Sequence, residues 1–341
     1  MKKLGVGLIG TGWVSNEYIK AFQNNPHCEV VAICSRDAGR ARAKAAEHGL
    51  KDCAAFDGLA EMLKEGALDI VAVCTPHDQH VEQGIACARA GKHLVMEKPV
   101  ALTLASLRAL DQAIRAAGVR TVTSFVLRWN PMFHNISAML DQNLIGEVYY
   151  AEVDYLHGIG PWYGSWKWLI SKKQGGSSLL MAGCHAVDAL RWFMRDEAVE
   201  VTACSNKSKS NKLQYEYDPN IVAIVRFAGG AIGKVASLVE CRMPYVFDVR
   251  LFGEKGTIRN NQVFTTDWPG QKGWAVIPTV LPDSGDVTHH PFQAEVDHFV
   301  ECILTGTESH ASVADAVKTH EICLGADLSA AEGRPVRLPL D

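Results

Sequence analysis

The chain has 341 residues, of which 48% are hydrophobic and 21% charged, a size and composition that suit two globular domains. Its formal net charge of −4 argues against the broad basic surface that nucleic-acid binding needs. The N-terminal apolar run is short and ends in glycines, and no stretch of about 18 apolar residues follows. We therefore expect no signal peptide, membrane span or nucleic-acid partner.

Ten cysteines are scattered between Cys28 and Cys323. They form neither a CxxC pair nor a close group with histidines, so reduced, buried thiols are favoured over disulfides or a zinc site. The pattern predicts a cytoplasmic protein without a structural metal.

In the first third, short apolar runs alternate with stretches of helical spacing at 37–47 and 103–117. This rhythm predicts repeated βα units and a doubly wound parallel sheet. We assign residues 1–124 to this domain and 125–341 to a second α/β domain. The apolar runs are 4–9, 28–34, 68–74, 92–97 and 120–125.

The pattern changes after Phe125. Residues 219–266 hold β-branched runs separated by turns, which predicts a β-meander with a primed two-residue turn at Gly229 and Gly230. Further predicted features are turns at 253–256 and 260–261, an exposed loop at 205–211, and helices near 292–304 and 312–332 that complete the second domain.

The segment GLIGTGWVS places Gly10, Gly12 and the small Ser15 between an apolar strand and a helical stretch. The first glycine permits a tight turn, and the second lets backbone amides approach a pyrophosphate at the helix N-terminus. Ser15 replaces the usual third glycine or alanine. The context favours dinucleotide binding over a turn without a ligand.

The second strand should end near Cys34, where NAD sites usually place an acidic residue. Here Ser35 and Arg36 follow, and a guanidinium beside a hydroxyl suits the 2′-phosphate of NADP. Asp37 leaves NAD open, because it can be a helix N-cap, a ribose ligand or a surface charge. We expect NAD or NADP, with a slight preference for NADP.

Glu97, Lys98 and Pro99 follow the apolar run HLVM, at the sheet edge where ligands bind. The proline keeps Lys98 out of the helical region. A lysine in a cleft can stabilise a developing alkoxide, although a surface lysine before a helix is the alternative.

Three segments together, residues 7–15, 74–100 and 175–192, resemble the Gfo/Idh/MocA family, named for glucose-fructose oxidoreductase, inositol dehydrogenase and a rhizopine-catabolism protein. The resemblance covers essentially the whole chain. It implies an N-terminal Rossmann domain and a C-terminal α/β domain with an open, mostly antiparallel sheet. The exposed face of that sheet commonly makes homodimer or homotetramer contacts.

The resemblance also implies roles for individual residues. His77 stands where asparagine is more usual, and the HxxH spacing with His80 favours cofactor packing and capping over a metal. Arg128 resembles an arginine at the domain junction, with a structural salt bridge as the alternative. The residues that match cofactor positions are Gly10, Thr11, Gly12, Trp13, Val14, Thr75, Pro76, His77, His80, Glu97 and Lys98.

In the second domain, Gly183, His185 and Asp188 match the family's GxHxxD segment, which implies that His185 lies near the substrate hydroxyl. Histidine suits proton transfer near neutral pH. Many family dehydrogenases have aspartate four residues earlier, where this chain has Met181. Three explanations stay open: His157 or Tyr163 substitutes, Lys98 and His185 suffice, or ordinary dehydrogenation has been lost.

The segment around His157 is rich in aromatic residues. Such rings can stack on the apolar face of a sugar, or they can fill a core. The rings are Tyr155, Trp162, Tyr163, Trp166 and Trp168, and the predicted substrate-binding residues are Lys98, Arg128, His157, Trp162, Tyr163 and His185.

The resulting hypothesis is NAD(P)-dependent hydride transfer to or from a secondary alcohol of a sugar, polyol or glycoside, with Lys98 and His185 as catalytic residues. Two alternatives stay open. One is a lyase or glycosidase that oxidises a sugar carbon transiently with tightly held NAD. The other is a nucleotide-sensing regulator without catalysis.

Overall fold

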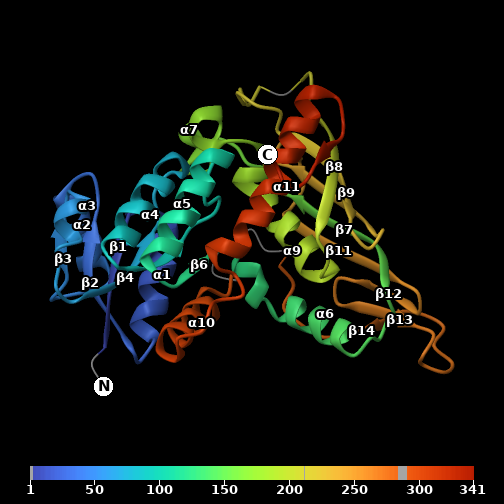
Figure 1. Cartoon of the computed structure of the whole chain (residues 1–341), viewed down its shortest axis with the longest axis horizontal. Helices are drawn as coiled ribbons and strands as arrows, with labels where there is room; N and C mark the ends of the chain where they lie inside the picture. Colours follow the sequence, from blue (N-terminus) through green and yellow to red (C-terminus); the bar gives the residue numbers. More distant parts are fainter. Residues whose placement is uncertain (1–2, 211, 283–289) are drawn as a thin grey trace. The chain divides into compact units, whose positions relative to one another are not determined.

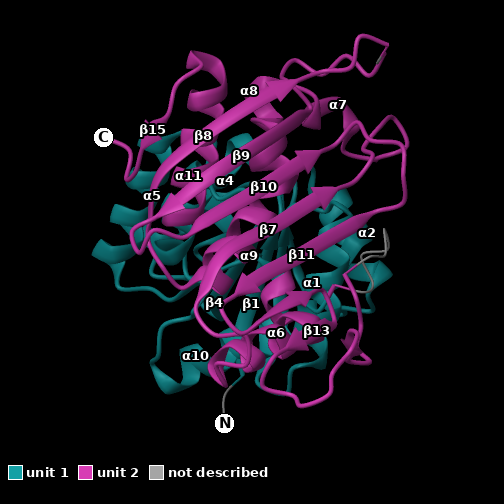
Figure 2. Ribbon diagram, turned by 90° about the vertical axis from the view of Figure 1, so that its right-hand side faces the viewer, with its two compact units in different colours: residues 1–126, 291–317 teal, residues 127–290, 318–341 magenta. Residues whose placement is uncertain are grey.

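The chain folds into two compact units. The computed structural model describes residues 3–210, 212–282 and 290–341. Unit 1 comprises residues 1–126 and 291–317, and unit 2 comprises residues 127–290 and 318–341 (Figure 2). The boundary after residue 126 lies close to the expected boundary after residue 124. Residues 291–317, however, group with unit 1, although we expected them in the second domain.

Unit 1 contains a six-stranded parallel sheet in the order β3-β2-β1-β4-β5-β6, the Rossmann order. The sequence pattern missed the edge strand β3, whose three residues are only half-buried. The strands are β1 (Leu4–Ile9), β2 (Cys28–Cys34), β3 (Ala54–Phe56), β4 (Leu68–Val73), β5 (His93–Met96) and β6 (Thr121–Thr123).

The helices of unit 1 begin and end at recognisable signals. Asp37 caps the second helix, Thr103 caps the fifth, and Gly118 ends the fifth in the left-handed conformation. The helices are α1 (Trp13–Asn24), α2 (Ala38–Glu47), α3 (Leu59–Met62), the 3₁₀ turn η1 (His77–Gln79), α4 (His80–Arg89), α5 (Leu104–Ala117) and α10 (Phe292–Thr305).

Helix α10 joins unit 1 by packing beside α1, as Figure 1 shows. The Phe292 ring meets the Tyr18 ring edge-on with centroids 5.1 Å apart, and Asn25 donates a hydrogen bond of 2.7 Å to Asp297. These contacts explain why α10 belongs with unit 1 despite its position late in the sequence.

Unit 2 is built on a nine-stranded sheet in the order β14-β13-β12-β11-β7-β10-β9-β8-β15. Strands β7 and β10 pair in parallel and the other described pairs are antiparallel, which confirms the predicted fold class. The strands are β7 (Val148–Leu156), β8 (Ala198–Asn206), β9 (Asn220–Phe227), β10 (Ile232–Leu238), β11 (Val246–Gly253), β12 (Gly256–Arg259), β13 (Gln262–Thr265), β14 (Ala275–Val276) and β15 (Val336–Arg337).

One face of this sheet is covered by the α9 helix, which packs on β7 and β10. The long strands β8, β9, β10, β7 and β11 run across the front of unit 2 in Figure 2. Along β9, buried and exposed residues alternate. The remaining helical elements are η2 (Val126–Trp129), α6 (Pro131–Asp141), α7 (Trp166–Leu169), α8 (Lys172–Gly175), the π-helix η3 (Leu179–Gly183), α9 (Cys184–Met194) and α11 (Val313–Glu332).

Two details of the predicted meander are wrong. Strand β7 lies between β10 and β11, because the connection at 239–245 carries the chain past it, and an alternating pattern does not encode the pairing partner. The turn between β9 and β10 is longer than two residues: Gly230 N–H donates to the Phe227 carbonyl, and Phe227 N–H to that of Ala231. Gly230 has a φ of 94°, as in a three-residue loop with a bulge.

The other turn and helix predictions mostly agree with the structure. Residues 254–255 and 260–261 connect strands, and α10 and α11 lie close to their expected ranges. Strand β8 extends to Asn206, so the expected loop begins at Lys207; residue 211 at its end lies outside the described residues.

Candidate active site

The carboxyl ends of five strands in unit 1 are in register. Ile9 pairs with Cys34 and Val73, Val73 with Met96, and Met96 with Thr123. The next residue of each strand therefore lies in one row along the edge where doubly wound sheets bind ligands. That row consists of Gly10, Ser35, Cys74, Glu97 and Ser124.

Gly10 forms the turn between β1 and α1. Its φ is 101°, and a Cβ there would lie 2.4 Å from the carbonyl oxygen of Cys74. Both the positive φ and the close approach of neighbouring backbone require glycine. The position therefore needs glycine for the structural reason that the sequence motif predicts.

Gly12 is the N-cap of α1, and within the described ranges no side chain caps this helix. A Cβ at Gly12 would have nothing within 4 Å, so the space in front of the helix is open. Backbone N–H groups beginning at Trp13 and Val14 face that end, which fits a pyrophosphate. Ser15 is buried and its hydroxyl donates to the Gly12 carbonyl at 2.6 Å, so the third motif position keeps its packing role.

The second strand end carries Ser35, whose hydroxyl oxygen lies 3.4 Å from that of Thr11. Arg36 is exposed. Asp37 accepts the Gly39 N–H at 2.6 Å, so it acts as the N-cap among the three alternatives considered for it.

After β4, His80 connects two predicted cofactor segments. One ring nitrogen lies 2.8 Å from the Thr75 carbonyl and the other 2.8 Å from the Pro99 carbonyl. Burial lowers the pKa of His80, although both hydrogen bonds oppose that shift. His77, also buried, lies with its ring centroid 5.6 Å from that of His80. The buried imidazole of His80 thus connects the Thr75–Pro76 segment to the Glu97–Pro99 segment.

Glu97 and Lys98 follow β5, and both side chains are half-buried. The Lys98 N–H donates to Glu97 Oε2 at 3.2 Å, and the Lys98–Pro99 peptide is cis. Burial raises the pKa of Glu97, while the Lys98 charge and hydrogen bonds from Ser124 and Tyr18 oppose that shift. Lys98 is therefore held next to a carboxyl group at the ligand-binding edge.

In unit 2, Gly183 allows the start of α9 to approach the sheet. A Cβ at Gly183 would lie 2.6 Å from Cβ of Ser237 on β10. The close approach fixes the first turn of α9, which carries His185, and His185 is 7% exposed. The glycine of the GxHxxD segment therefore has a packing role.

Asp188 lies one turn after His185 and binds Arg128 in a buried, two-pronged ion pair. Arg128 Nε and Nη2 lie 2.7 and 2.5 Å from the two Asp188 oxygens. Thr319 donates to Asp188 at 3.1 Å, and the Arg128 guanidinium lies 4.8 Å from the centroid of a Trp192 ring. The structural salt bridge considered for Arg128 is thus present; substrate binding by Arg128 stays a prediction.

A series of aromatic rings leads from His185 to His157 and beyond. Tyr155 lies nearly parallel to the imidazole, at 17° with centroids 6.4 Å apart, and its hydroxyl is 3.1 Å from His157 Nδ1. His157 also meets Tyr163 edge-on and lies 4.9 Å from Tyr245 between centroids. The sequence analysis missed Tyr245, because it lies outside the three family segments.

Met181 is buried on the π-helix that precedes α9. The wider turn of a π-helix changes how position 181 is placed relative to His185 compared with a continuous α-helix. Tyr155 contacts both His185 and His157, and His157 in turn contacts Tyr163; whether either residue substitutes for the aspartate stays a prediction.

The other aromatic residues divide by exposure. Trp162 is 71% exposed and its ring lies against Gly160, whereas Trp166 packs edge-on against Tyr215. Of the five rings considered, Tyr155 is the buried one. Over the described ranges, no group of three or more His, Cys, Asp or Glu side chains could hold a metal.

Comparison with known proteins agrees with this arrangement. Residues 4–125 match the model of the Gfo/Idh/MocA oxidoreductase family with an NAD-binding Rossmann fold, and residues 133–259 match that family's C-terminal domain. A 1,5-anhydro-D-fructose reductase of Ensifer adhaerens is 30% identical over 260 residues, which span 76% of each chain. The chain belongs to the Gfo/Idh/MocA family. This membership confirms the resemblance and makes the protein an oxidoreductase.

Two more distant relatives are similar over nearly the whole oxidoreductase. A scyllo-inositol 2-dehydrogenase (NAD(+)) of Bacillus subtilis is 24% identical, with 98% of this chain and 95% of that protein covered. The solved structure of a levoglucosan dehydrogenase, in complex with NADH and L-sorbose, superposes with a TM-score of 0.89 at 21% identity over the full length of both chains. The similarity to the levoglucosan dehydrogenase structure shows that this chain has the same fold.

In the part of the oxidoreductase that the structure describes, none of the helices combines the length and apolar character needed to cross a bilayer.

Proposed function

We propose that this oxidoreductase interconverts a secondary alcohol and a ketone on a sugar, polyol or related glycoside, using NAD or NADP. The observation that carries the proposal is the row of strand ends in unit 1, which places the Gly10 turn and the Glu97–Lys98 pair on one ligand-binding edge. Relatives named for anhydrofructose and inositol chemistry support this substrate class.

The cofactor's pyrophosphate would be held by the turn from Gly10 to Val14, where α1 offers open space and backbone N–H groups. We assign its nicotinamide end to Thr75, Pro76, His77, Glu97 and Lys98. His80 would position these segments through its two carbonyl contacts.

Ser35 and Arg36 would hold the adenosine ribose. The family description and the names of relatives mention NAD, so they do not support our preference for NADP, which rests on the exposed guanidinium of Arg36. That preference stays a prediction.

When bound, the nicotinamide supplies the two-electron acceptor for alcohol oxidation. The Lys98 ammonium would stabilise negative charge that develops on the substrate oxygen. The imidazole of His185 would take the hydroxyl proton. Because aspartate is replaced by Met181, we infer that His157 supports His185 through Tyr155, whose hydroxyl contacts His157 and whose ring lies along His185.

Trp162, Tyr163 and Arg128 would complete the substrate contacts. The exposed Trp162 ring can stack on the C–H face of a sugar, and Tyr163 adds a hydroxyl beside His157. Arg128 would act mainly through Asp188, since its guanidinium already binds that carboxylate in two places.

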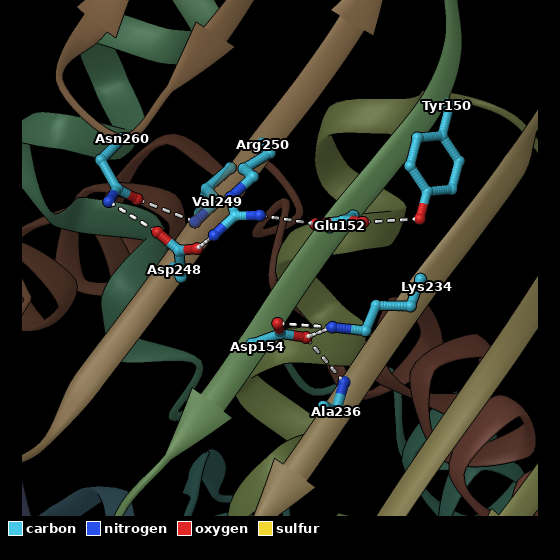
Figure 3. Close-up of polar contacts among 9 residues, drawn as sticks. All are labelled: Tyr150, Glu152, Asp154, Lys234, Ala236, Asp248, Val249, Arg250 and Asn260. Atoms are coloured by element: carbon cyan, nitrogen blue, oxygen red, sulfur yellow. Dashed lines mark hydrogen bonds and ion pairs between the residues drawn. The ribbon is translucent and has the colours of Figure 1, made fainter. Parts of the chain in front are cut away.

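We also propose a homodimer or homotetramer formed through the open sheet of unit 2. Val222 and Ile224, each about two-fifths exposed, present apolar surface on β9. Neighbouring charges neutralise each other within the sheet, as Figure 3 shows: Lys234 binds Asp154 at 2.6 Å, and Arg250 bridges Glu152 and Asp248. Internally paired charges lower the cost of covering this face. Analytical ultracentrifugation of Val222→Lys and of the wild type tests the proposed oligomer, because a charge inserted in this face should dissociate it.

A reducing cytoplasm fits the ten cysteines, which are free thiols in the structure.

The deciding experiment identifies any nucleotide that copurifies by mass spectrometry, then follows nicotinamide absorbance across sugars, inositols and sugar acids. Net reduction of added NAD or NADP by a member of the panel supports the dehydrogenase. Tightly held nucleotide with product formation but no net redox change would favour the lyase or glycosidase. This alternative stays open because Met181 replaces the family's aspartate. Tight nucleotide binding without any turnover would favour the regulator.

A further inference from the structure

Four polar side chains of unit 1 form a group beside Lys98, and all of them except Glu97 have no role in the proposed chemistry. They are Tyr18 of α1, Glu97 after β5, Ser124 after β6 and Glu295 of α10, and we call them the carboxyl network. Tyr18, Ser124 and Glu295 are at most 1% exposed. The carboxyl group of Glu295 is thus fully buried, and the half-buried carboxyl group of Glu97 is close enough for its charge to act on Glu295, so ionising both is costly.

The two hydroxyl groups bridge the two carboxyl groups. The Tyr18 hydroxyl oxygen lies 2.7 Å from Ser124 Oγ and 3.0 Å from Glu295 Oε1, and Ser124 Oγ lies 3.5 Å from Glu295 Oε2. Burial raises the pKa of Glu97, and interactions with the same two hydroxyl groups oppose that shift, so Glu97 belongs to the same network. The contacts connect α10 to the end of β5, although these elements are far apart in the sequence.

Counting hydrogens shows what this arrangement needs. Tyr18 and Ser124 bring one hydroxyl hydrogen each, and two hydrogens cannot serve all the contacts in the network. A third hydrogen on one carboxyl group supplies a further donor and removes the repulsion between two carboxylates. Burial, followed by the charge of Glu97, raises the pKa of Glu295 well above its usual range. Glu97 faces Lys98, whose charge favours the ionised form of Glu97.

We propose that the pair Glu97 and Glu295 carries a single proton and that this proton resides on Glu295. We also propose that Glu295 is a positioning residue for the Lys98 turn. The connection runs through the bridging hydroxyl groups to Glu97, whose Oε2 accepts the Lys98 N–H. Ser124 also anchors the end of β5, because its N–H donates to the Met96 carbonyl at 2.9 Å. Cys74, the residue after β4, also lies near both carboxyl groups: burial, followed by the charges of Glu97 and Glu295, raises the pKa of its thiol. The positioning role rests on the function proposed for Lys98, whereas the proton sharing does not.

Infrared spectroscopy tests the shared proton without turnover. Protein labelled with ¹³C in its glutamate carboxyl groups, at neutral pH, should show a protonated-acid C=O band. The band should disappear in Glu295→Gln and persist in Glu301→Gln, a matched change at an exposed position of α10. A wild-type spectrum without the band, or a band that survives in Glu295→Gln, would overturn the proposal.

The pH dependence of unfolding provides a second readout. A carboxyl group whose folded-state pKa is raised stabilises the fold fully at low pH, and this contribution is lost as pH rises through the folded-state pKa. The unfolding temperature of Glu295→Gln minus that of the wild type should therefore grow as pH rises above the ordinary carboxyl range. A difference that is constant with pH contradicts a raised, shared proton.

Kinetics test the positioning role. Glu295→Gln mimics the protonated side chain and should keep kcat within about fivefold of the wild type. Glu295→Ala removes the bridge and should lower kcat on the order of 100-fold, with substrate KM changed less. Equal losses in both variants, or none in Glu295→Ala, would overturn the role. If wild type turns over no substrate, the proposed function and this role both fail, while the infrared result still decides the shared proton.

Discussion

In unit 1 the residues assigned to the cofactor follow the ends of parallel strands, whereas in unit 2 those around His185 come from β7, the β7–α7 connection, the β10–β11 connection and α9. The first group works largely through backbone, as at the Gly10 turn and the N-terminus of α1. The second depends on side chains such as Asp188 and Tyr155. We therefore expect a changed side chain to have less effect in unit 1, as at Ser15, than in unit 2, where Met181 stands in place of the family's aspartate.

The largest effect should come from breaking the buried ion pair of unit 2. Asp188→Ala leaves the Arg128 guanidinium buried without its carboxylate, so the free energy of unfolding should fall by about 3–5 kcal/mol. Urea titration measures this. Asp141→Ala, which breaks an exposed pair with Arg195, should cost about 0–1 kcal/mol. Similar losses for both variants would remove the special dependence of unit 2 on buried side chains.

Lys98 is the exception in unit 1, where a side chain rather than the backbone should matter most. Lys98→Met keeps the length of the stem and removes the charge, so kcat should fall on the order of 1,000-fold with little change in unfolding temperature. Lys64→Met, at an exposed residue paired with Glu61, serves as the control. Near-normal turnover by Lys98→Met would exclude Lys98 from the chemistry.

For His185, the oxidation rate of the wild type should rise with pH through one ionisation and then level off. His185→Asn should erase that ionisation and slow oxidation by about 100-fold, while nucleotide affinity stays nearly constant because the residue belongs to unit 2. Steady-state rates across a range of pH measure the ionisation, and titration calorimetry measures the nucleotide affinity. If His157→Asn, and not His185→Asn, removes the ionisation, the base is His157.

The smallest expected effect concerns cofactor choice. Arg36→Ala should weaken NADP binding by about 2 kcal/mol relative to NAD, because only NADP carries the 2′-phosphate. Titration calorimetry with both nucleotides, and Arg40→Ala as a nearby exposed control, checks this. Equal weakening of both nucleotides would end the preference for NADP.

The short segments of unit 1 determine much of their own structure. Gly10 takes a positive φ in the turn between β1 and α1, and Asp37 and Thr103 cap helices through contacts within three residues. Because these conformations depend on neighbours in sequence and on the regular order of βα units, the motifs sufficed to predict the Rossmann domain and the turn.

Only the tertiary structure decided which distant segments meet. The placement of β7 between β10 and β11, the packing of α10 on α1, and the contact of Tyr245 with His157 all join residues far apart in the chain. Such contacts depend on strand register and on the packing of whole faces, which hydrophobic periodicity leaves open. For the same reason the sequence showed Glu97 beside Lys98, but only the fold brought Glu295 to the same two hydroxyl groups.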